Sequence, residues 1–128
     1  MQAEIRRLHT PDIDPATFTP DDPERFAFLV QMIAGPAGEK GEESFDFEVC
    51  TPGWLHEQAR REGPVNGRHH LIIDTFNWPA LQSYFQRLVT RCQGQDWNEI
   101  AAKLSRYGYW EFEDYDQTAG NANPGPHT

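Results

Sequence analysis

The sequence predicts a single α+β domain in which a mostly antiparallel sheet carries about three helices on one face. Two observations lead to this prediction. Residues 44–50 alternate apolar and polar side chains with the period of two that is typical of a strand with one buried face. Residues 81–92 instead repeat apolar side chains at intervals of three and four, as an amphipathic helix does. A chain of 128 residues is long enough to bury such a core without metals or disulfides.

The first half of the chain is predicted to form three strands. Residues 3–8 are a short candidate strand, and the Pro- and Asp-rich residues 10–23 form a loop. Residues 26–34 are apolar on both sides, which predicts a central strand covered on both faces. The Gly-rich residues 35–41 then join this strand to the strand at 44–50 as an antiparallel hairpin.

A short motif after the third strand predicts a helix start. Thr51 is a good N-cap residue, and Pro52 is suited to the first helical turn. Trp54 then turns back toward the core, and the helix is expected to end at Gly63. Cys50 opens this motif and, like Cys92, is predicted to be a buried, inert thiol. Cys50, Thr51, Pro52 and Trp54 are therefore interpreted as a structural motif.

The second half of the chain is predicted to form two strands and two helices. A strand is expected at residues 68–76, and the amphipathic helix is expected to run from Asn77 or Trp78 to Gly94. Asp96, with Glu99 three residues later, begins a further helix that ends at Gly108. A last strand is expected over residues 109–114. The domain is assigned to residues 1–116, and residues 117–128 are expected to form a flexible tail.

The charge is unevenly distributed along this acidic chain. The net charge is −9, and residues 12–48 hold ten carboxylates against two cations. Such a surface repels nucleic acid and anionic membranes, and it attracts a basic protein partner. The alternative interpretation is that the charge provides solubility alone. The chain has no apolar run long enough for a membrane span and no apolar signal-peptide segment near its start, so a cytoplasmic location is predicted.

Candidate catalytic groups are few. Adjacent strand positions point to opposite faces, so His69 and His70 are not expected to bind one metal ion together. The carboxylates of the third and last strands could form an acid–base or cation site, but no matched base, nucleophile or phosphate-binding loop accompanies them. A solvated acidic face is the favoured interpretation, with no cofactor and no metal. The carboxylates in question are Asp46, Glu48, Glu111, Glu113 and Asp114.

Several stretches resemble the immunity protein 8 family of bacterial polymorphic toxin systems. They read RLHTPDIDP, PERFAFLVQMIAGPAGEKGEESFDFEVCTPGWL, HHLIIDTFNWPALQSYF and WEFEDY. The similarity covers residues 3–115, and its most specific part is the strand and turn at residues 45–55. The resemblance implies a cytosolic antidote that binds the toxin encoded beside it and blocks an essential surface. It implies no catalytic residues.

The function expected from these observations is neutralisation of a cognate toxin by non-covalent binding. If the toxin is a basic nuclease domain, carboxylates can occupy its substrate site as phosphate mimics, and the acidic loop of residues 12–24 is a further source of them. Aromatic side chains supply apolar anchors at such interfaces. The candidate partner-binding residues are Asp46, Glu48, Glu111, Glu113, Asp114, Trp78 and Phe18.

Two other classes of function stay open at this point. One is a small hydrolase or metal-dependent enzyme that uses His69 or His70 with the C-terminal carboxylates. The other is a general protein-interaction module without a toxin partner. The sequence predicts no strand order and no oligomeric state.

Overall fold

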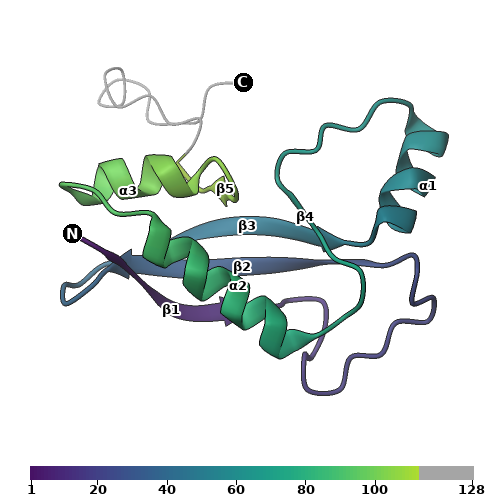
Figure 1. The fold of residues 1–128 in the computed structure, drawn as a ribbon, viewed down its shortest axis with the longest axis horizontal. Coiled ribbons are helices and arrows are strands. Elements are labelled where there is room, and N and C mark those ends of the chain that lie inside the picture. The colour runs from purple at the N-terminus through teal and green to yellow at the C-terminus, as the bar shows by residue number, and fades with distance from the viewer. Residues whose placement is uncertain (113–128) are drawn as a thin grey trace.

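The computed structural model describes residues 1–112 and contains a five-stranded mixed sheet with three helices (Figure 1). In chain order the elements are β1 (Ala3–His9), β2 (Ala27–Pro36), β3 (Glu43–Cys50), α1 (Pro52–Glu62), β4 (His70–Ile72), α2 (Trp78–Arg91), α3 (Trp97–Leu104) and β5 (Tyr109–Trp110). The strands follow the order β1-β2-β3-β4, and β5 pairs with β3 as well. Only the β3–β4 pairing is parallel among those of the described residues. The predicted fold class is confirmed.

The core lies between one face of the sheet and two of the helices. The alternation in β2 and β3 buries every second side chain on this face, including Val30 and Phe47. The helical stripe of α2 supplies Leu81, Phe85, Leu88 and Val89 to the same cluster, as its spacing predicted. The rings of Phe47 and Phe85 meet edge to face with their centres 4.9 Å apart. α2 crosses the strands in Figure 1, and α3 lies beside its C-terminal end.

The three helices contribute unequally to this core. α2 and α3 both bury apolar side chains, whereas α1 buries none. α1 stands at the far end of β3 in Figure 1 and connects β3 to the parallel strand β4. None of the helices within residues 1–112 combines the length and apolarity needed to cross a bilayer.

The second face of the sheet differs from the prediction. β2 is central, between β1 and β3, as expected. Its other face, however, carries the half-buried side chains of Leu29, Gln31 and Ile33. The buried side chains of α2 and α3 belong to the core cluster on the opposite side. The expectation that both faces of β2 are covered is therefore wrong, and we refer to this second side as the open face.

Two strands are shorter than predicted. The backbone N–H of Ile73 donates to the Cys50 carbonyl over 2.8 Å, but the strand itself ends at Ile72 and not at residue 76. β5 covers two residues, and the N–H of Glu111 adds one more bond to the Ser44 carbonyl. Glu113, Asp114 and the predicted tail of residues 117–128 lie outside the described residues.

Candidate functional site

The Cys50–Trp54 motif forms a joint between three segments of backbone. The Thr51 hydroxyl donates to the Glu24 carbonyl over 2.7 Å. It also accepts from the N–H groups of Phe26 and Trp54, each over 3.3 Å. One buried hydroxyl thus uses its donor and both of its acceptor positions. It caps α1 and fixes the end of the β1–β2 loop to the end of β3.

Gly53 allows this loop to approach the helix closely. A Cβ atom added to Gly53 would lie 2.3 Å from the Glu24 carbonyl oxygen, closer than real Cβ contacts come. Pro52 occupies the first turn of α1, and the Trp54 ring is half-buried with its centre 6.0 Å from the His70 ring. These contacts account for the motif by structure alone.

The two cysteines have the properties of buried structural thiols. Both are free and buried, and Cys50 has no exposed surface. Burial raises the pKa of Cys50 to about 11, and the Glu48 carboxylate adds to this shift. Burial also raises the pKa of Cys92. Because the thiolate is the reactive form, these environments disfavour nucleophilic or metal-binding chemistry at either sulfur.

The carboxylates of β3 lie on the open face with their cross-strand partners. Asp46 is paired with Gln31 of β2 on one side and with Tyr109 of β5 on the other. Glu48 is paired with residues of β2 and β4, namely Leu29 and His70. Directly paired residues project from the same side of a sheet, so the strand register gathers these side chains on one surface.

The same surface is hollowed between β3, β4 and the loops around it. The hollow has a volume of about 510 Å³, and its lining combines carboxylates with an arginine, two histidines, a tyrosine and a leucine. Its lining comprises Asp12, Leu29, Asp46, Glu48, Arg68, His69, His70 and Tyr109. The sequence indicated the carboxylates of this set. It did not indicate Leu29, Arg68 or Tyr109, which only the strand register and the path of the chain bring here.

The two β3 carboxylates are desolvated where they stand. Burial raises the pKa of Asp46, and nearby Glu111 adds to the shift while a hydrogen bond with Gln31 opposes it. Burial likewise raises the pKa of Glu48, with His70 opposing the shift and Asp12 adding to it. One Asp46 oxygen, Oδ1, is buried without a hydrogen-bond partner. A cation bound at this surface would stabilise the ionised forms of Asp46 and Glu48, which burial disfavours.

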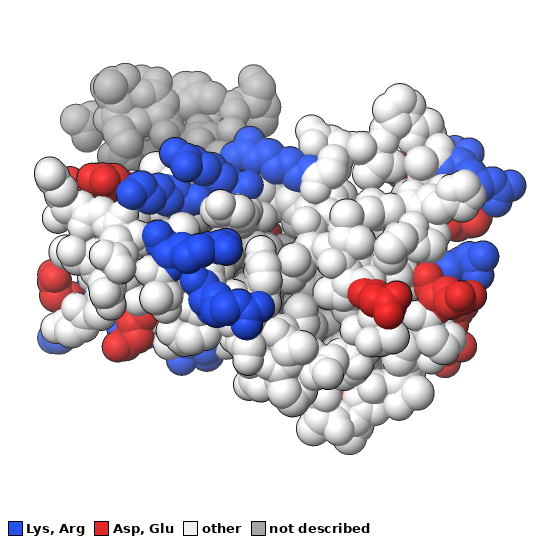
Figure 2. All heavy atoms as spheres, viewed as in Figure 1, with Lys and Arg blue, Asp and Glu red and all other residues white. Residues whose placement is uncertain are grey.

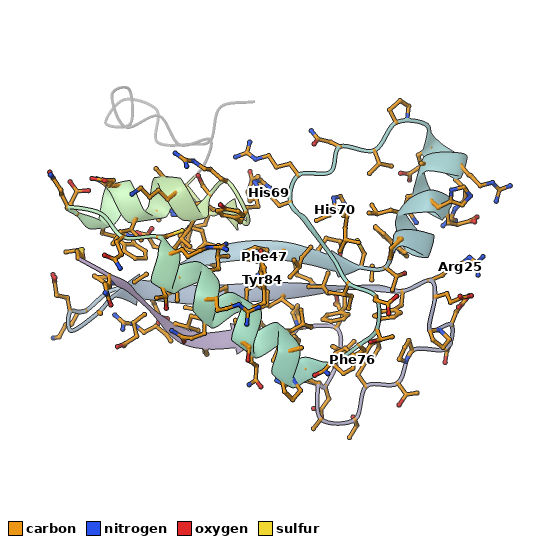
Figure 3. The ribbon with its side chains drawn as sticks, in the orientation of Figure 1. Arg25, Phe47, His69, His70, Phe76 and Tyr84 are labelled. Atoms are coloured by element: carbon orange, nitrogen blue, oxygen red, sulfur yellow. The ribbon has the colours of Figure 1, made fainter. Side chains whose placement is uncertain are left out.

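His69 and His70 both line the hollow, and Figure 3 shows His69 toward β5 and His70 toward α1. His69 Nε2 lies 3.1 Å from the Ser105 carbonyl oxygen, and its ring meets that of Tyr109 edge to face. The expectation that the pair points to opposite faces of a strand fails because β4 begins only at His70. Within residues 1–112, no three His, Cys, Asp or Glu side chains are placed to hold a metal ion.

The other predicted partner-binding residues are distributed over the molecule. Glu111 lies close to Asp46, and its Oε1 accepts from the Ser44 N–H over 2.7 Å. Phe18 instead joins a cluster of phenylalanine rings on the core side, 4.9 Å from the ring of Phe76. Trp78 opens α2 and is half-buried against the core. The structure therefore brings Glu111 to the open face and leaves both aromatic residues away from it.

Comparison with models of known protein families identifies a family for this chain. The model of the Imm8 family, described as Immunity protein 8, matches residues 3–115. No curated protein and no solved structure matches the chain. Since the match spans nearly the whole described fold, the chain belongs to the immunity protein 8 family.

Proposed function

We propose that this protein binds and neutralises a cognate toxin domain of a bacterial polymorphic toxin system in the cytoplasm, by non-covalent contact with its open face. Membership of the immunity protein 8 family supports toxin binding. The observation that carries the choice of surface is the desolvation of Asp46 and Glu48 beside a hollow on a sheet face that neither α2 nor α3 covers.

The chemistry of this surface fits a cationic partner. Desolvation of a carboxylate normally opposes binding, but here folding has already removed much of the water around Asp46 and Glu48. An arginine or lysine of the partner would therefore meet a smaller remaining desolvation cost at these two carboxylates. Close charge pairs at such interfaces couple by about 1.5–7 kcal/mol. A nuclease whose substrate site is basic is the toxin class that this arrangement suits best.

A growth assay with the toxin encoded beside this gene tests the proposal. The wild-type protein should restore growth to cells that express the toxin. The double variant Asp46→Lys/Glu48→Lys should fail to do so, because it places two cations against a cationic partner. The control is Glu62→Lys, which makes one such charge reversal, half that of the double variant, at an exposed position at the end of α1. Rescue by the double variant equal to that by the wild type would rule out the open face.

One observation favours a second candidate, a small hydrolase or metal-dependent enzyme. The hollow brings His69 and His70 beside two carboxylates with raised pKa values, and such groups are common in active sites. Titration of the toxin with purified protein separates the two functions. An inhibitor reaches full neutralisation at a fixed molar ratio, whereas an enzyme neutralises an excess of toxin and does so progressively with time.

A general interaction module without a toxin partner makes a different prediction in the same experiments. Such a protein would leave toxin activity unchanged at every ratio and would not restore growth. Restoration of growth by the wild-type protein is therefore sufficient to distinguish the proposed antidote from this alternative.

A further inference from the structure

We propose that a second copy of this chain docks on the helix side of the molecule to form a two-fold symmetric dimer. The surface concerned consists of the segment 71–75, the outer side of α2 and the end of α3, and we refer to it as the helix-side surface. Its helices lie across the sheet from the open face, whereas Ile72, which is paired with Cys50, lies at the sheet edge between the two surfaces. The inference is independent of the proposed function, which places the toxin contact at Asp46 and Glu48.

The centre of the helix-side surface is an apolar hollow. It has a volume of about 410 Å³ and lies between β4, the segment that follows it and the first half of α2. Its lining comprises Leu71, Ile72, Ile73, Asp74, Thr75, Asn77, Ala80, Leu81 and Tyr84. Ile72 leaves 56% of its surface exposed, more than any other large hydrophobic side chain of residues 1–112. It belongs to β4, which ends the strand order β1-β2-β3-β4 of the described part of the chain.

Cations gather on one side of this hollow. Arg87 and Arg91 are exposed one helical turn apart on α2, and both act on the electrostatic environment of Tyr84 in the hollow. The Arg91 guanidinium lies 5.9 Å from the centre of the Tyr107 ring, and Arg106 is exposed next to that tyrosine. Figure 2 shows a group of lysine and arginine side chains over α2 and α3. This grouping is local in a chain whose net charge is −9.

Carboxylates lie on the other side of the hollow. Asp74 lines the apolar hollow and also a neighbouring one that is lined by Glu24 and Arg25. In Figure 2 acidic side chains appear at this end of the face, with a recessed uncharged area between them and the basic group. Arg25 also lies at this end, where its guanidinium is paired with the Asp22 carboxylate over 3.3 Å. Asp74 and Glu24 therefore leave this side of the hollow with an excess of negative charge, opposite the arginines of α2.

This arrangement is complementary to itself under a two-fold rotation. An axis through the hollow places Asp74 of one copy near the arginines of the other, and the same contact occurs twice. The apolar linings of the two hollows, including the exposed Ile72 at the edge of each, then face one another, and the charges surround them, as in a typical protein interface. A long polyanion such as nucleic acid fits less well, because it would run from the arginines onto Asp74 and Glu24. Both open faces remain accessible in such a dimer.

Sedimentation velocity over a range of protein and salt concentrations tests the dimer. The wild type should dimerise, and more weakly as salt increases. Ile72→Arg should raise the dimer dissociation constant at least about tenfold, since it puts two cations at an apolar centre. Asp74→Arg alone and Arg87→Asp/Arg91→Asp alone should each lose the dimer to a similar extent, because each sets like charges opposite one another.

Mixing the two charge variants provides the decisive control. In a heterodimer of Asp74→Arg with Arg87→Asp/Arg91→Asp, opposite charges face each other at both contacts, so an equimolar mixture should dimerise although neither variant does alone. Native circular dichroism spectra of each variant exclude unfolding as the cause of lost association. A wild type that stays monomeric at every concentration and salt would overturn the proposal. So would a dimer that Ile72→Arg leaves intact, or a mixture that fails to associate.

Discussion

Replacing Thr51 with valine removes one hydroxyl from the interior at almost constant volume, so its effect on stability measures the joint between the β1–β2 loop, β3 and α1. Thr51 is 1% exposed, and its hydroxyl bonds to one carbonyl and two N–H groups. Loss of a helix N-cap alone costs about 1 kcal/mol. A buried polar group left without a partner costs about 1–3 kcal/mol.

These contributions overlap at Thr51. The Trp54 N–H is the group that the N-cap satisfies, so the loss of its hydrogen bond is already included in the cost of the cap. The carbonyl of Glu24, an exposed residue, regains a hydrogen bond from water. The Phe26 N–H belongs to a buried residue and is the main additional loss. We therefore expect Thr51→Val to lower the free energy of unfolding by about 2–4 kcal/mol.

Urea unfolding followed by tryptophan fluorescence measures this change. With a slope of about 2 kcal/mol per molar urea, the middle of the usual range, the midpoint should fall by about 1–2 M. The control is Thr51→Ser, which keeps the hydroxyl and removes one methyl group, and which should cost about 1 kcal/mol. If Thr51→Val lay within about 0.5 kcal/mol of the wild type, the hydroxyl would not hold the three segments together.

Three further predictions follow from individual positions. Gly53→Ala should destabilise the protein by about 1–3 kcal/mol in thermal unfolding, because its Cβ would lie 2.3 Å from a backbone oxygen, whereas Gly67→Ala, with open space around it, should have little effect. Asp46→Asn should raise the free energy of unfolding at neutral pH while weakening toxin binding. Burial raises the pKa of Asp46 above its ordinary value of 3.8, so as the pH falls the folded state takes up the proton before the unfolded state does. The stability gained by the variant should therefore vanish below pH 3.8. A gain that persists in acid would contradict this cause. Cys50 and Cys92 should not react with a thiol reagent in the native protein and should both react in urea, and a count of one or two reactive thiols before unfolding would contradict their burial.

Local sequence patterns predicted most of the elements of this fold. The alternation of residues 44–50 and the apolar repeat of residues 81–92 each follow the period of a strand or helix with one buried face. The structure confirms the strand in the first case and the helix in the second. The Thr51 and Asp96 caps were also readable, because a cap is a contact between residues three positions apart. These signals lie within a few residues of one another in the chain.

Features that depend on distant segments were not predictable. The apolar residues 71–73 indicated a strand, but this strand ends at Ile72 because its partner β3 ends at Cys50. Nothing in the sequence near Ile73 encodes the end of β3. Leu29 and Ile33 were predicted to be covered, yet within residues 1–112 the buried side chains of α2 and α3 belong to the core on the other side of β2. The same limit applies to the candidate site. The carboxylates of β3 were identifiable as a polar strand face, but the register that puts Tyr109 and His70 beside them was not.

The association rate of the toxin domain, measured at low salt by stopped-flow fluorescence, tests the central proposal most directly. Electrostatic steering toward the open face predicts that Asp46→Lys/Glu48→Lys slows association by at least about tenfold, that Glu62→Lys changes it little, and that added salt reduces the difference. Equal rates for the wild type and the double variant across all salt concentrations would show that the toxin binds elsewhere.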